Sequence, residues 1–146
     1  MIGACGGGPA VPSPVITLTV SPNPIPYVSL PPRVPPGQTT PDCCFTLDAT
    51  WTAIISSNRR ATISSQHVRL ADAQSGLTLG DADTLAMGGV GRSVAAGQRT
   101  SVEMKWLGEV GSGFRRSSRL RMELTLTFDL GEGVRDQEVA EVDWTE

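Results

Sequence analysis

Three cysteines and one histidine are the side chains with the widest range of chemistry in this 146-residue sequence. Cys43 and Cys44 are adjacent, and neither belongs to a Cys-x-x-Cys pair or to another spacing typical of zinc ligands. We therefore predict no metal site and no cofactor.

Three alternatives stay open for the adjacent cysteines. If they lie in a strand, their side chains face opposite sides, so one is a buried thiol and the other an exposed thiol. In an oxidising compartment, Cys43 and Cys44 can instead form a vicinal disulfide. The third alternative is a bridge to Cys5 or to another chain. Thiol titration under denaturing conditions separates these states.

The remaining candidates for catalysis or metal binding are weak. His67 has no nucleophile at a recognisable spacing, and the sequence contains no Gly-x-Ser-x-Gly motif. Asp81 and Asp83 offer two carboxylates, whereas an EF-hand loop needs more ligands and a terminal glutamate, so a polar turn is the favoured interpretation. We predict a protein without catalytic activity.

Arginines gather in one short segment near an acidic one. Four of the 11 arginines lie in residues 115–121, and seven of the 15 acidic residues lie in 129–146. Cross-strand ion pairs between the two segments are expected, each contributing about a few tenths of a kcal/mol. We place Arg115 and Arg116 in the preceding loop, where with Phe114 they are candidates for binding an acidic partner such as a protein, lipopolysaccharide or an anionic glycan.

Proline divides the chain into two parts. All 11 prolines lie at or before Pro41. Residues 1–14 mix glycine with proline and predict a flexible tether, and residues 15–146 form the single domain that this length and 39% apolar composition support. The proline-rich loop at 31–42 is a second candidate contact surface, to which Arg33 and Tyr27 would contribute.

Alternation of apolar and polar residues predicts strands along the domain. A phase change near Ser64–His67 predicts a bulge or a crossing, and the two strands on either side of the polar turn at 56–59 are a hairpin candidate. The predicted strands are Val15–Val20, Tyr27–Leu30, Cys43–Ile55, Arg60–Leu70, the short pieces Leu77–Leu79 and Leu85–Met87, Gln98–Val110, Leu120–Leu130 and Val134–Trp144. Proline around the first strand predicts that it lies at a sheet edge.

The last two strands predict their own register. Pairing Leu130 with Val134 across the Gly131-Glu-Gly133 turn puts Trp144 opposite Leu120 and Val142 opposite Met122. The same register sets Arg121 opposite Asp143, and Asp129 opposite Arg135. It also opposes two like charges, Glu123 and Glu141, which is the unfavourable pair of this assignment.

About seven short strands, regular turns and a tryptophan at 51 inside a central strand resemble an immunoglobulin-like or fibronectin-type domain. The resemblance implies an all-β, antiparallel immunoglobulin-like β-sandwich with an extended N-terminal arm. A barrel or jelly roll is the alternative, because alternation does not say how the faces close.

The segment Ile2-Gly3-Ala4-Cys5 resembles the lipobox of bacterial envelope lipoproteins. In such a protein, the charged and apolar regions of the signal peptide lie upstream of this segment. The resemblance implies that Cys5 is acylated, that membrane association occurs only through this N-terminal lipid, and that the domain is extracytoplasmic, either periplasmic or at the cell surface.

Charge and hydropathy narrow the functional classes. A net charge of −3 gives no general attraction to nucleic acid, and no apolar run is long enough to span a bilayer. We predict a non-catalytic binding or assembly module that recognises a protein or an anionic glycan in the cell envelope. The alternatives are a structural accessory subunit of an envelope complex and, third, a carbohydrate-active or other small enzyme.

Overall fold

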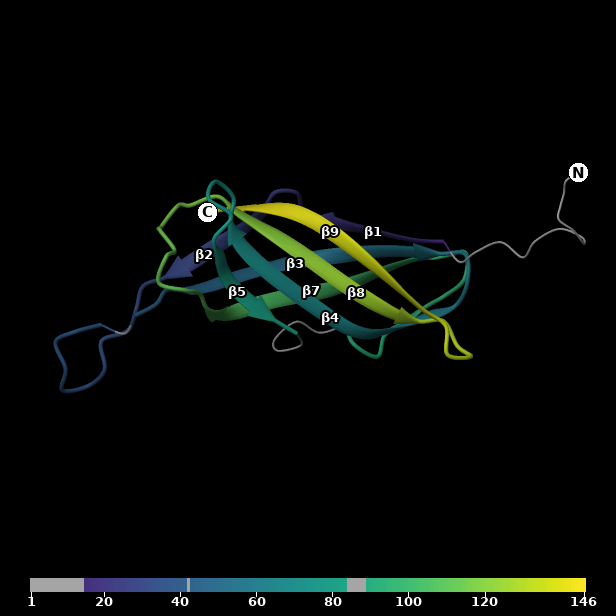
Figure 1. Cartoon of the computed structure of the whole chain (residues 1–146), viewed down its shortest axis with the longest axis horizontal. Helices are drawn as coiled ribbons and strands as arrows, with labels where there is room; N and C mark the ends of the chain where they lie inside the picture. The colour runs from purple at the N-terminus through teal and green to yellow at the C-terminus, as the bar shows by residue number, and fades with distance from the viewer. Residues whose placement is uncertain (1–14, 42, 84–88) are drawn as a thin grey trace, which may run out of the picture.

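The computed structural model describes residues 15–41, 43–83 and 89–146. Within these ranges the chain forms a two-layered β-sandwich (Figure 1). The strands are β1 Ile16–Ser21, β2 Ile25–Leu30, β3 Thr46–Ser57, β4 Ala61–Asp72, β5 Thr78–Ala82, β6 Ser93–Val94, β7 Arg99–Glu109, β8 Leu120–Asp129 and β9 Arg135–Thr145.

The strands divide between two antiparallel sheets. In the first sheet, β3 pairs with β7 on one side and with both β1 and β2 on the other. In the second sheet the order is β9, β8, β4, with β5 and β6 both pairing with β4. A short parallel pairing of Ile25 and Pro26 with the end of β9 joins the two sheets at one edge.

The predicted all-β sandwich is therefore confirmed. The assignment to the immunoglobulin-like group stays a prediction. Among the described residues β1 pairs only with β3, as expected of an edge strand. No helix in the described ranges is long and apolar enough to cross a membrane.

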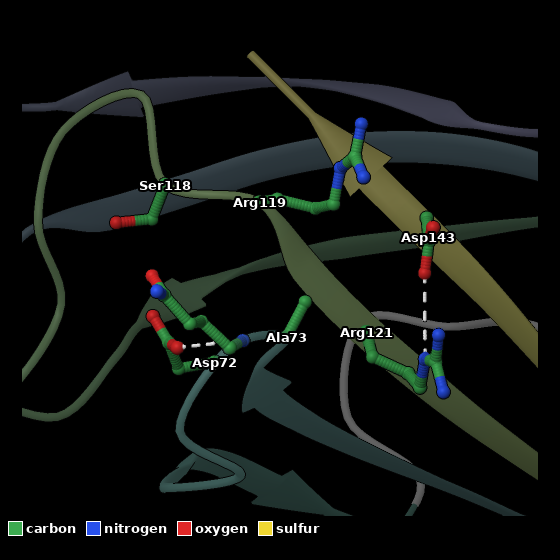
Figure 2. Close-up of a pocket in the computed structure, with 7 residues that line it drawn as sticks. Asp72, Ala73, Ser118, Arg119, Arg121 and Asp143 are labelled. Atoms are coloured by element: carbon green, nitrogen blue, oxygen red, sulfur yellow. Dashed lines mark hydrogen bonds and ion pairs between the residues drawn. The ribbon is translucent and has the colours of Figure 1, made fainter.

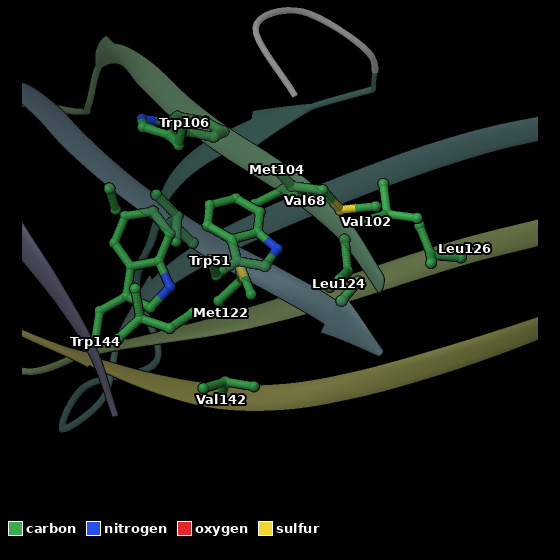
Figure 3. Packing of buried hydrophobic residues seen from close by; sticks show 14 of the residues in the cluster. Trp51, Val68, Val102, Met104, Trp106, Met122, Leu124, Leu126, Val142 and Trp144 are labelled. Carbon is green, nitrogen blue, oxygen red and sulfur yellow. The ribbon is translucent and has the colours of Figure 1, made fainter. Parts of the chain in front are cut away.

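The core lies between the inward faces of the two sheets (Figure 3). Every second residue of β3 from Leu47 to Ile55 is buried, as the alternation predicted. Trp51 from β3 and Trp144 from β9 pack with their ring centroids 5.7 Å apart. Burial of this apolar surface is the main stabilising contribution to folding.

The predicted register of the last two strands is confirmed residue by residue. Leu120 pairs with Trp144, Met122 with Val142, and Asp129 with Arg135. The like-charged pair Glu123 and Glu141 is also present in the structure.

The predicted hairpin of β3 and β4 is wrong. The two strands lie in different sheets, and the short turn between them carries the chain across the sandwich. Arg59 fixes this crossing, because its Nη2 donates a 2.8 Å hydrogen bond to the carbonyl of Leu130 beyond β8. The predicted bulge is confirmed, as the β4–β8 register shifts between Ile63 and Ser65.

Some predictions concern residues outside the described ranges. These are the tether at 1–14 with its lipobox-like segment and Cys5, and the short apolar piece Leu85–Met87. The described residues between β2 and β3 contain no strand, in agreement with the predicted proline-rich loop.

Candidate functional site: a groove lined by arginine

The two ends of the sandwich carry different features. Ile16 at the start of β1 pairs with Ser57 at the end of β3, whereas Leu30 at the end of β2 pairs with Thr46 at the start of β3. Because β3 has 12 residues, these two ends lie roughly 35 Å apart at the rise of an extended strand. We call the end with Leu30 and Thr46 the distal end.

An open groove of about 440 Å³ lies at the distal end (Figure 2). It lies between the turn that joins β4 to β5, the residues that lead into β8, and the last part of β9. Its lining residues are Asp72, Ala73, Gln74, Ser118, Arg119, Arg121 and Asp143.

The β4–β5 turn forms one wall of the groove. The Asp72 carboxylate accepts hydrogen bonds from the backbone amides of Gln74 at 2.9 Å and Ser75 at 2.8 Å. These bonds, with that from Ser75 as the larger cause, lower the pKa of Asp72. The Ala73 amide donates to the carbonyl of Arg119 at 3.0 Å, so the turn is bonded to the opposite wall.

Arginine supplies the positive charge of the groove. Arg121 Nε lies 3.4 Å from Asp143 Oδ1, and this ion pair is drawn in Figure 2 with the Arg119 side chain nearby. Within the described ranges the Arg119 guanidinium has no hydrogen bond or ion pair. Asp72 is hydrogen-bonded by its own turn and Asp143 is paired with Arg121, so neither acid of the lining forms an ion pair with Arg119.

The loop from β7 to β8 is held in place by aromatic packing. Phe114 is 4% exposed and packs against Phe45 and Tyr27, with centroid separations of 5.3 Å and 6.1 Å. The Tyr27 hydroxyl donates to the carbonyl of Ser118 at 2.6 Å. Burial, with a smaller contribution from the Glu146 charge, raises the pKa of Tyr27 to about 12.

Phe114 and Tyr27 therefore have a different role from the one predicted. Both side chains are buried and position the loop, so neither is exposed for contact with a partner. The prediction failed because it treated aromatic residues beside a loop as surface residues, whereas this loop closes over the end of the hydrophobic core.

Glu146 is a second anchor of the same loop. Its carboxylate accepts hydrogen bonds from the Ser117 amide at 2.6 Å and from both the amide and the hydroxyl of Ser29. The Ser29 hydroxyl is the largest cause that lowers the pKa of Glu146, with Arg116 contributing through its charge. Ser117 adopts a φ of 61°, so the backbone takes the left-handed conformation and the loop turns tightly at this residue.

The predicted arginines are exposed, and two of them lie on the loop that leads to the groove. Arg115 and Arg116 lie on the same loop as Arg119, and neither forms a salt bridge within the described part of the chain. Arg33 is also exposed but lines a separate depression with Val34, Pro35 and Pro36. Arg115 and Arg116 thus share a loop with the groove residue Arg119, whereas Arg33 lies at a different depression.

Cys43 and Cys44 are joined to each other by a disulfide. Cys43 is exposed and Cys44 is half-buried, just before β3 begins. Of the three alternatives, the structure contains the vicinal bridge.

His67 has two acidic partners that the sequence reading did not assign to it. Its Nε2 lies 2.8 Å from Asp81 Oδ1 and its Nδ1 lies 2.6 Å from Asp83 Oδ1. Both ring nitrogens of His67 therefore lie within hydrogen-bond distance of a carboxylate oxygen. The pairing of Val68 with Ala82 places these side chains together, and a predicted β4–β5 hairpin would have supplied that signal.

Sequence reasoning also missed Arg119, Asp72 and Glu146 as members of the distal end. No protein-family model matches this sequence, and a comparison with curated proteins finds no match.

Proposed function

We propose that this protein is a non-catalytic binding module, displayed outside the cytoplasm on an N-terminal arm lipidated at Cys5. Its distal end recognises an acidic protein or an anionic glycan of the cell envelope. The observation that carries the proposal is the set of three exposed arginines in the β7–β8 loop, Arg115, Arg116 and Arg119, of which Arg119 lines the groove.

The position of the groove supports display from a membrane. The described chain begins at Val15, beside Asn58, at the end of the sandwich opposite the groove. A tether attached there directs the groove away from the membrane surface. Guanidinium groups suit this role because they bind carboxylate and sulfate oxygens in a planar, two-point manner.

Heparin, a sulfated glycan, is a suitable probe of the groove. We expect the variant with Arg115, Arg116 and Arg119 all changed to Ala to bind heparin at least about tenfold more weakly than the unmodified chain, a loss of roughly 1.4 kcal/mol. Surface plasmon resonance at two salt concentrations measures this, and the affinity of the unmodified chain should fall with added salt.

The matched control changes two exposed arginines at the other end, Arg60 and Arg99, to Ala. This variant changes net charge in the same direction without altering the groove, and it should keep most of the affinity. If the control loses as much affinity per arginine as the groove variant, binding reflects net charge and the proposed site is wrong.

A structural accessory subunit is the second candidate, and an exposed apolar surface favours it. Val28 and Leu30 on β2 and Val34 in the following loop are 58%, 45% and 55% exposed. Leu107, 49% exposed, lies across β3 from Val28, since both pair with Asp48. In that role, this surface would be covered by another chain, and a V28K/L107K variant would no longer co-purify with it. A small enzyme remains the third proposal, without a specific observation in its favour.

A further inference from the structure

The adjacent cysteines lie beside a carboxylate that the groove does not use. The Sγ atoms of Cys43 and Cys44 and a carboxylate oxygen of Glu109 all lie within 4.8 Å of one another. Two sulfurs and one oxygen at this separation form a potential ligand set for a single metal ion.

The sheet register explains why Glu109 is there. Glu109 at the end of β7 pairs with Thr46 at the start of β3, and the Val110 amide donates to the carbonyl of Phe45 at 3.0 Å. Cys44 is two residues before Thr46, so it is a diagonal neighbour of Glu109 if the alternation of β3 continues. The pairing of β3 with β7 thus places the Glu109 carboxylate beside the cysteines that precede β3.

We infer that, once its disulfide is reduced, the Cys43–Cys44 pair binds a thiophilic divalent cation such as Zn²⁺ together with Glu109. The oxidised pair cannot do so, because a disulfide has no thiolate to donate. The site is therefore controlled by the thiol redox state around it.

The chemistry balances with a dithiol reductant. The S–S bond breaks, two electrons and two protons pass to the cysteines, and the reductant is oxidised to its own disulfide. On metal binding, the two thiols release their protons to solvent, and both sulfurs and the Glu109 carboxylate donate electron pairs to the ion. Water completes a tetrahedral set of four ligands.

The exposure of the site suits exchange of both reductant and metal. Cys43 and Glu109 are exposed and Cys44 is half-buried. The disulfide closes a ring through the two cysteines, and an ion inserted between the two sulfurs makes that ring larger by only one atom. Thiolate ligands select zinc, cadmium and similar ions over magnesium and calcium.

Metal titration of the full chain carrying C5S tests this inference, because Cys43 and Cys44 are then the remaining cysteines. Reduced protein, freed of reductant without oxygen, is titrated with Zn²⁺ against a chromophoric chelator, and with Cd²⁺ to observe thiolate charge-transfer absorbance. We expect one ion per chain in the reduced state, no comparable binding in the oxidised state, and loss of binding in C43S/C44S.

Two further variants test the role of the carboxylate. E109Q should weaken Zn²⁺ binding by about tenfold or more, since even indirect partners of metal ligands have effects of this size. E103Q, on the same strand and exposed, is the matched control and should leave the affinity unchanged. Circular dichroism of each reduced variant verifies that the fold is retained.

Several results would overturn the inference. These are equal affinity of the oxidised and reduced chains, retention of binding in C43S/C44S, no effect of E109Q, or one ion shared by two chains. Reduced protein that unfolds, while C43S/C44S stays folded, would also contradict it, because the dithiol form would then not present the site.

Discussion

At the scale of single residues, this protein uses polar contacts to hold its distal loop. The Tyr27 hydroxyl and the Glu146 carboxylate bind neighbouring backbone groups, the carbonyl of Ser118 and the amide of Ser117. The exposed arginines are thereby presented from a loop that is anchored at both the aromatic and the acidic contact. Such preorganisation reduces the conformational entropy that binding would otherwise cost.

Tyr27 provides a direct measurement of this anchoring, because it is the single tyrosine of the chain. Its pKa is raised from 10.0 to about 12 by burial and by Glu146, so the folded state retains the proton at pH values where the unfolded state releases it. The stabilising contribution is fully present below pH 10 and is lost as the pH rises from 10 towards 12.

We expect tyrosinate absorbance to appear in the folded protein only well above pH 10, together with the onset of alkaline unfolding. E146Q should lower the apparent pKa of Tyr27 by removing the smaller, electrostatic cause, and Y27F should show no phenolate signal. Ionisation near pH 10 in a protein that is still folded would show that Tyr27 is not buried in this contact.

At the scale of elements, alternation predicted strand faces well and strand neighbours poorly. The buried face of β3 and the register of β8 with β9 follow from the spacing of apolar residues and from a tight glycine turn. The pairing of β3 with β7 and of β4 with β8 joins segments far apart in sequence, which no local pattern encodes. The same limit led to the wrong hairpin, whereas the contact between His67 and Asp81 was missed because the local pairing of β4 with β5 was not predicted.

The arginine loop shows the corresponding limit for the candidate site. The clustering of arginines in the sequence identified Arg115 and Arg116 as candidates, because a local excess of charged residues can be recognised from the sequence alone. Burial of Phe114 and Tyr27 depends on how the loop folds over the end of the sandwich, so it required the tertiary structure.

The β8–β9 register makes a further prediction about stability. Glu123 and Glu141 lie opposite each other, while Arg69 of β4 lies opposite Glu123 on its other side. E141K converts the repulsive pair into an attractive one, so we expect the free energy of unfolding in urea to rise by about 0.5 kcal/mol.

The control for this change is E103K, which alters net charge equally at a position opposite Thr52. Its effect should be smaller, and the difference between the two variants should shrink with added salt. If β8 and β9 paired in a different register, E141K and E103K would change the free energy of unfolding equally.

At the scale of the whole molecule, the proposed function depends on the arrangement of the two ends. The chain enters the sandwich at Val15, and the groove lies at the other end of a 12-residue strand. Attachment of the N-terminal arm to a membrane should therefore leave the groove accessible, whereas attachment at the groove should block it.

Maleimide-lipid coupling to vesicles tests this polarity. Cys43 and Cys44 are bonded to each other, so coupling is directed to Cys5. Protein coupled in this way should bind heparin within about twofold of the free protein, while C5S/Q74C protein, coupled at the exposed groove residue Gln74, should bind about tenfold or more weakly. Equal heparin binding by both coupled forms would show that recognition does not occur at the groove. Loss of binding only in the protein coupled through Cys5 would place the recognition surface near the N-terminal end. Weaker binding only in the protein coupled through Q74C is the result consistent with a module that is held at one end and recognises its partner with the other.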